Sequence, residues 1–130
     1  MTELEKLKTA ADLIRETSQG RLELCASDVG CAYVRASDDA YIAMNMVMRN
    51  DYSGGYVDVT FNAYVRRMGS EMSAKDLNAL QQEVQQAYAL VQALEVMRFQ
   101  PTLDDLSAFQ SYLKQEQAQH QQIHADQQFM

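Results

Sequence analysis

Residues 56–66 read YVDVTFNAYVR and carry the strongest secondary-structure signal in the chain. Apolar residues stand at every second position from Val57 to Val65, and polar residues or tyrosines occupy the positions between them. Because successive side chains of a strand point to opposite faces, this alternation predicts a β-strand with one face in the core and one polar face.

The residues before this strand also follow a period of two. Leu22 and Leu24 open a first strand, residues 31–36 form a second, and residues 40–48 form a third. The third strand places four apolar side chains on one face, namely Ile42, Met44, Met46 and Met48. Turn-forming residues at 28–30 and 37–39 and a loop at 50–55 separate these strands. We therefore expect a four-stranded antiparallel meander sheet.

An amphipathic helix is predicted before the sheet, over residues 2–17. Apolar residues recur there at spacings of three and four, at Leu4, Leu7, Ala11 and Ile14. Thr2 and Glu5 have the spacing of a capping box, and Gly20 can adopt the left-handed conformation that ends a helix.

Two more helices are predicted after Gly69. Ser73 and Asp76 resemble a capping box, and the helix from residue 74 to 99 carries a heptad-like apolar stripe at Leu77, Leu80, Val84, Ala87, Val91 and Leu94. Pro101 interrupts the pattern, and a final helix follows with Leu103, Leu106, Phe109 and Leu113. We expect a coiled-coil-like helical hairpin whose glutamine-rich end frays.

These elements predict one α+β domain over residues 1–130: an N-terminal helix, a four-stranded antiparallel meander sheet and a C-terminal helical hairpin. Residues 1–69 hold the helix and the sheet, and residues 70–130 hold the hairpin. The length of 130 residues suits a single domain.

The helix over residues 74–99 is longer than the sheet it accompanies. It would measure roughly 39 Å, against about 33 Å for an eleven-residue strand. Its apolar stripe then extends past its own sheet, which favours a homodimer formed through Leu77, Leu80, Val84, Val91 and Leu94. The alternative is a monomer in which the same residues belong to the core.

Charge and cysteine content restrict the partners. The chain has 18 acidic and 11 basic residues and a net charge of −7, which opposes direct binding to nucleic acid or to anionic membranes. No apolar run is long enough to span a bilayer, so we expect no membrane contact. Cys25 and Cys31 do not make a disulfide framework, which favours a reducing, cytoplasmic location.

Tyrosines gather in and beside the predicted sheet. Tyrosine and arginine are enriched in recognition surfaces because they bury a large area while keeping a polar end. We predict a partner-binding sheet face that consists of Tyr33, Arg35, Tyr56, Tyr64 and Arg66. The alternative is that a helix covers this face.

Evidence for chemistry is sparse. Glu116, His120 and His124 recur every four residues and form a weak candidate metal site without a fourth ligand. Cys25 or Cys31 could in principle meet one of these histidines, yet no nucleophile turn or oxyanion loop accompanies them. We expect no cofactor, no resident metal and no catalytic residues.

The sequence thus predicts a non-catalytic accessory protein of bacterial or phage type that binds itself and another protein. One alternative is an acidic decoy that inhibits a nucleic-acid-handling enzyme, because residues 70–130 contain 8 acidic and 3 basic groups. A second alternative is a small metal-dependent or cysteine-dependent enzyme.

Overall fold

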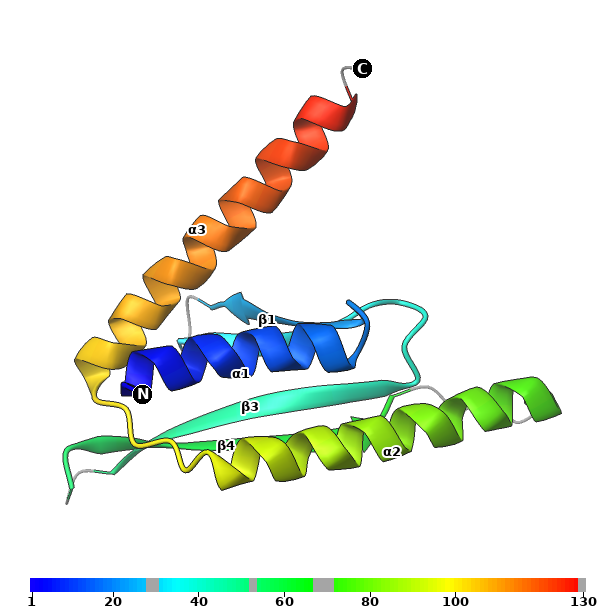
Figure 1. Cartoon of the computed structure of the whole chain (residues 1–130), viewed down its shortest axis with the longest axis horizontal. Coiled ribbons are helices and arrows are strands. Elements are labelled where there is room, and N and C mark those ends of the chain that lie inside the picture. The colour runs from blue at the N-terminus through cyan, green and yellow to red at the C-terminus, as the bar shows by residue number, and fades with distance from the viewer. Residues whose placement is uncertain (28–30, 52–53, 67–71, 129–130) are drawn as a thin grey trace.

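The computed structural model describes residues 1–27, 31–51, 54–66 and 72–128, and at 50–51 and 119–128 it describes the backbone alone. Seven elements follow one another along the chain (Figure 1). They are α1 (Glu3–Thr17), β1 (Leu22–Ala26), β2 (Ala32–Ala36), β3 (Ile42–Asp51), β4 (Tyr56–Val65), α2 (Ala74–Val96) and α3 (Leu103–Gln128). The fold is therefore α+β, as predicted.

Side chains cap all three helices, two of them at the predicted capping boxes. The Thr2 hydroxyl accepts the Glu5 amide at 3.1 Å, and the Ser73 hydroxyl accepts the Asp76 amide at 3.2 Å. Before α3 the pair is reciprocal, because Thr102 accepts from the Asp105 amide while the Asp105 carboxylate accepts from the Thr102 amide.

The strands form two antiparallel hairpins rather than one hydrogen-bonded sheet. β1 pairs with β2, and β3 pairs with β4 in a register that places Ile42 opposite Val65. The prediction of a single four-stranded meander was wrong in this respect, although β2 and β3 are neighbours in space.

A carboxylate from α2 explains part of this break in the sheet. Glu83 accepts the Tyr41 amide at 3.0 Å and the Ile42 amide at 3.2 Å, and it also pairs with Arg21. The Ile42 amide, at the start of β3, would otherwise be available to a neighbouring strand. A side chain thus takes the place of a strand at this point.

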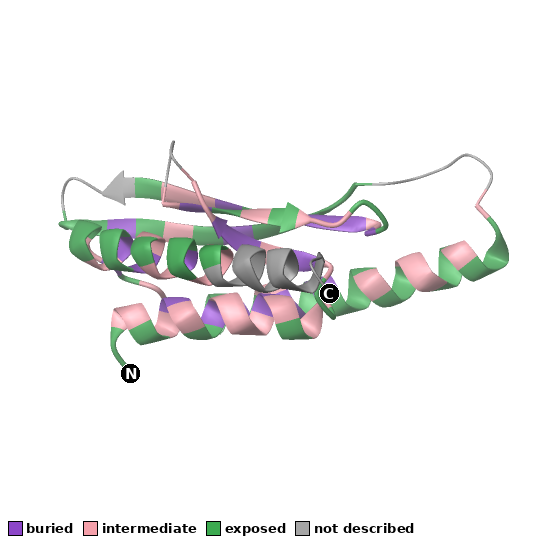
Figure 2. Ribbon diagram, turned by 90° about the horizontal axis from the view of Figure 1, so that it is seen from above, coloured by how far each residue is buried: buried purple, intermediate pink, exposed green. Residues whose placement is uncertain are grey.

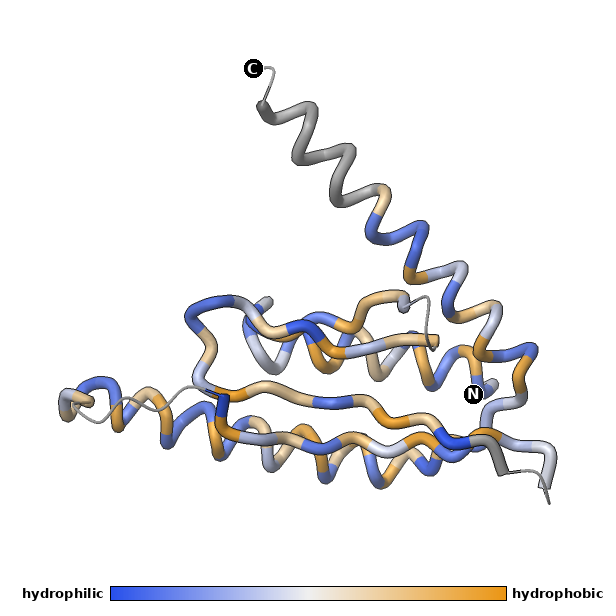
Figure 3. Tube along the Cα trace, turned by 180° about the vertical axis from the view of Figure 1, so that it is seen from behind, coloured by the Kyte–Doolittle hydropathy of each residue, from blue (hydrophilic) through white to orange (hydrophobic). Residues whose placement is uncertain are grey.

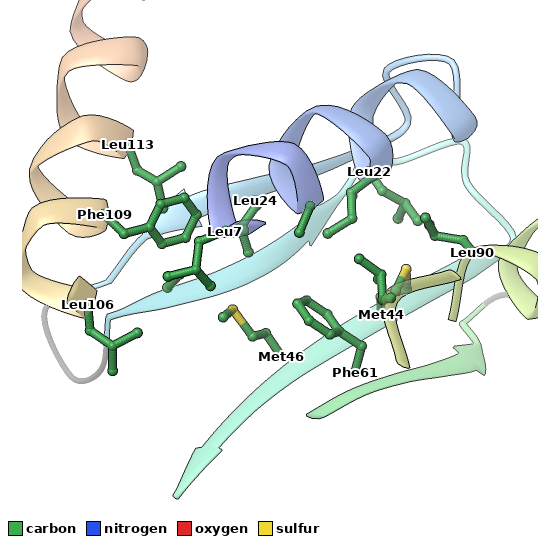
Figure 4. Packing of buried hydrophobic residues seen from close by; sticks show 14 of the residues in the cluster. Leu7, Leu22, Leu24, Met44, Met46, Phe61, Leu90, Leu106, Phe109 and Leu113 are labelled. Carbon is green, nitrogen blue, oxygen red and sulfur yellow. The ribbon is translucent and has the colours of Figure 1, made fainter. Parts of the chain in front are cut away.

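Helices α1 and α2 lie on one side of the two hairpins and leave the other side open (Figure 2). Apolar and polar residues alternate along the strands and along α2 (Figure 3), which lets each element turn one face inward. The core includes buried side chains from all seven elements, among them Leu7, Leu24, Met44, Phe61, Leu90 and Phe109 (Figure 4).

The two C-terminal helices do not form the predicted hairpin. α2 lies alongside β4, whereas α3 diverges from α2 at a steep angle and packs against α1 and β1 (Figure 1). Arg98 has a positive φ of 53°, and the Pro101 carbonyl accepts the Val57 amide at 2.8 Å. The connection is therefore extended and tied to β4, so α3 cannot fold back along α2.

Two hydrogen bonds fasten α3 to the β1–β2 hairpin. The Cys31 thiol donates to the Leu106 carbonyl at 2.8 Å, and the side-chain amide of Gln110 donates to the Ser27 carbonyl at 2.6 Å. The Phe109 and Tyr112 rings stack at 6.3 Å, and Lys8 of α1 lies over the Tyr112 ring. The first half of α3 is thus part of the domain.

Candidate protein-binding surface

The open side of the strands carries the five residues predicted to bind a partner. Tyr33 and Arg35 come from β2, Tyr56 and Tyr64 come from β4, and Arg66 follows β4 directly. All five are exposed, and the three tyrosines keep between 44% and 49% of their surface accessible. We call this set the strand face. α1 and α2 lie on the other side of the strands (Figure 2). Gln117 of α3 reaches the buried Cys25, which is the cross-strand neighbour of Tyr33, and Tyr33 itself stays exposed.

Both arginines of the strand face are held by neighbouring groups. Arg35 donates to the Glu23 carboxylate of β1 at 2.8 Å. Arg66 donates to the Ser37 carbonyl at 2.6 Å and lies 4.0 Å from an Asp38 oxygen. These contacts reduce the freedom of the two long side chains, so a partner would meet positioned guanidinium groups.

The residues predicted for self-association divide into two groups. Leu77 and Val84 are 48% and 42% exposed, and Leu80 and Val91 are half-buried. Leu94 is 0% exposed and belongs to the core, so its assignment to an interface was wrong. The reason is that the second half of α2 packs against the domain, while its first half reaches past the strands (Figure 1).

The weak candidate metal site lies mostly outside the described side chains. α3 is helical as far as Gln128, so Glu116, His120 and His124 do recur every four residues on one helix. The imidazoles themselves are not described. Among the side chains that are described, no three histidine, cysteine or acidic residues group as metal ligands would.

The two thiols are poorly suited to nucleophilic chemistry. Cys25 is buried in β1, and Cys31 is half-buried directly before β2, close to the positions that the sequence predicts. Burial raises the pKa of both thiols above the usual value. They are therefore protonated at neutral pH, whereas a nucleophile must be a thiolate.

Two polar links from α2 to the start of β3 could not be read from the sequence. One is the Glu83 carboxylate described above. The other is the Tyr41 hydroxyl, which donates to Asp76 at 3.0 Å. Hydrogen bonds from Ser73 and Tyr41 lower the pKa of Asp76. The residues joined by these hydrogen bonds are 35 or more positions apart in sequence, and no local sequence pattern predicts such pairs.

Comparisons with protein-family models, curated proteins and solved structures find no match. Within the described part of the chain, no helix has both the length and the apolar character needed to cross a bilayer.

Proposed function

We propose that this chain is a non-catalytic accessory protein that binds another protein through the strand face. The observation that carries this proposal is the exposure of three tyrosines on an uncovered side of the strands. Aromatic rings that are rigid, half-exposed and flanked by positioned arginines have the composition of binding hot spots. The raised pKa values of both thiols argue against the cysteine-dependent alternative.

Removal of two tyrosines is expected to abolish partner capture. The Tyr33→Ala plus Tyr56→Ala variant should keep its fold, because both side chains are exposed. Each lost hot spot costs about 2 kcal/mol or more in binding. The measurement is affinity capture from a lysate of the source organism, with quantitative mass spectrometry of the proteins retained by the wild type and by the variant.

A Leu103→Ala variant serves as the matched control, since Leu103 is a large exposed side chain on α3, outside the strand face. A protein that both the wild type and Leu103→Ala retain, and that the double variant loses, is a partner of the strand face. If the double variant retains the same proteins as the wild type, the strand face is not the binding site. Loss of capture at moderate salt alone would favour the acidic decoy instead.

The second part of the proposal is that the protein is a homodimer held by the projecting half of α2. Leu77 and Leu80 lie in this half, and Leu77 is almost half-exposed although it is a large apolar side chain. A second copy is the simplest partner that could cover an apolar stripe of this kind.

We expect the wild type to show twice the mass of one chain in light scattering, and Leu77→Asp to show the mass of one chain. A charge at an exposed position changes the stability of the single chain by only about 0.5 kcal/mol, so the variant should keep the wild-type far-UV circular dichroism spectrum. Its unfolding temperature should fall only by the contribution of association. A monomeric wild type at millimolar concentration would contradict the dimer and leave the strand-face proposal standing.

A further inference from the structure

The outer edge of β4 is an unpaired strand edge. β4 pairs with β3 alone. The Arg66 amide points toward β3, where it bonds Tyr41, and the Val57 amide points outward, where it bonds Pro101. Because this direction alternates along an antiparallel strand, the outward backbone groups belong to Val59, Phe61, Ala63 and Val65. Within the described residues, no backbone hydrogen bond reaches these four.

An apolar groove runs beside this edge. It has a volume of about 280 Å³, and its α2 wall includes Val84, Tyr88 and Val91. On β4 it is lined by the consecutive residues 61–65, which belong alternately to the two faces of the strand. A space bounded by both faces lies along the edge of the strand rather than underneath it. The groove therefore combines free backbone groups with an apolar wall.

One end of the groove is acidic. Pro101, shortly after the end of α2, is bonded to Val57 near the start of β4, so the C-terminal end of α2 lies at the start of the strand. Glu95 lines the groove at that end. Among the described side chains its carboxylate has no ion-pair partner. A cationic side chain would complement this end.

We propose that the groove between β4 and α2 binds an extended segment of a partner polypeptide, which adds as a strand to the free edge of β4. The four outward residues repeat every second position, and an extended chain matches that repeat with its own backbone groups. The segment would have apolar residues at alternate positions against α2 and a lysine or arginine beside Glu95. The two sites adjoin at Tyr64, which belongs to the strand face and also lines the groove. The strand-face variant substitutes Tyr33 and Tyr56, which do not line it.

A second copy of this chain is the less suitable occupant of the groove. Antiparallel pairing of two β4 edges would place both α2 helices on the same side of the joined sheet. α2 lies along β4 in both Figure 1 and Figure 3 and contacts β4 more than β3. The two helices would therefore both lie over the two joined edge strands, and paired strands are only about 5 Å apart. Packed helices need about 8 to 10 Å. An isolated extended segment carries no helix and avoids this clash.

The test uses three synthetic nonapeptides in which valine and threonine alternate. One has lysine at both ends, one has glutamate at both ends, and one is the lysine peptide with every second backbone nitrogen methylated. The readouts are fluorescence anisotropy for affinity and amide hydrogen exchange of the protein, followed by NMR. We expect the lysine peptide to bind at least tenfold more tightly than the other two and to slow exchange at Phe61, Ala63 and Val65.

A substitution at the edge provides the matched pair. Ala63→Pro removes an outward amide that β3 does not use, which an edge strand tolerates, and it should weaken the lysine peptide at least tenfold. Ala63→Ser keeps the amide and should bind like the wild type. If Ala63→Pro fails to fold, the methylated peptide tests the same hydrogen bonds without a variant.

Equal binding of the methylated and unmethylated peptides would overturn the proposal, as would unchanged exchange at Ala63 under saturating peptide. The Ala63 amide could also exchange slowly without peptide, and more slowly as the protein concentration rises. That result would assign the edge to a second copy and would overturn the proposal. None of these results bears on capture through Tyr33 and Tyr56.

Discussion

The Leu94→Asp variant is expected to be largely unfolded at room temperature. Leu94 is fully buried and packs in the cluster that joins all seven elements. The substitution removes a buried leucine and leaves a carboxylate without a partner in the core, at a cost on the order of 5 kcal/mol. That cost is comparable to the whole stability of a small domain. Circular dichroism with urea titration measures the loss.

Val84→Asp is the matched control, because it also replaces an apolar residue of the stripe by aspartate, ten residues earlier in α2. Val84 is 42% exposed, so its aspartate stays in water and the free energy of unfolding should change by about 1 kcal/mol or less. Equal destabilisation by the two variants would show that the first half of α2 is as deeply packed as the second. The division of the stripe described above would then be wrong.

The second large effect is expected for Phe109→Ala. Phe109 is completely buried, and its ring stacks on Tyr112 where α3 meets the rest of the domain. Truncation of a buried phenylalanine costs about 3 to 5 kcal/mol, because the transfer free energy is lost and a cavity is left. We expect a midpoint of urea denaturation well below that of the wild type, with little change in the slope.

Leu103→Ala is the corresponding control on α3. Leu103 is a large apolar residue in the same helix, but it is mostly exposed. Its truncation should change stability by no more than about 0.5 kcal/mol. A Phe109→Ala variant as stable as Leu103→Ala would mean that α3 contributes little to the core and could dissociate without loss of the fold.

Helix starts were predictable because their causes are local. Thr2, Ser73 and Thr102 each stand three residues before the acidic residue whose amide they bind. The hydrogen bond joins neighbours in sequence, so the pattern of residue types contains it. The strands were predictable for a similar reason, since alternation along 56–65 reflects the two faces of one strand.

The relation between the helices was not predictable in the same way. A heptad-like stripe on α2 indicates that one face of the helix avoids water, but it does not identify the surface that covers this face. In the structure β3, β4 and α1 cover the second half of α2, and α3 turns away because Pro101 is bonded to β4. That bond joins residues 44 apart, and no spacing in the sequence signals it.

The candidate site was predicted in part. Alternation placed Tyr56 and Tyr64 on one face, and the structure shows that this face is exposed. The groove beside β4 could not be predicted, because it depends on where α2 lies relative to the strand and on which edge stays unpaired. An unpaired edge and a paired one have the same sequence pattern.

The residue pattern alone therefore specified each helix and strand, their caps and the side of each strand that avoids water. These properties arise from contacts within a few residues, so the order of residue types is sufficient for them. The assembled fold decided the rest: which strands pair by hydrogen bonds, which half of α2 is buried and where α3 packs. Those outcomes depend on contacts such as Glu83 with Ile42, and the free energy of such contacts exists only once distant segments have met.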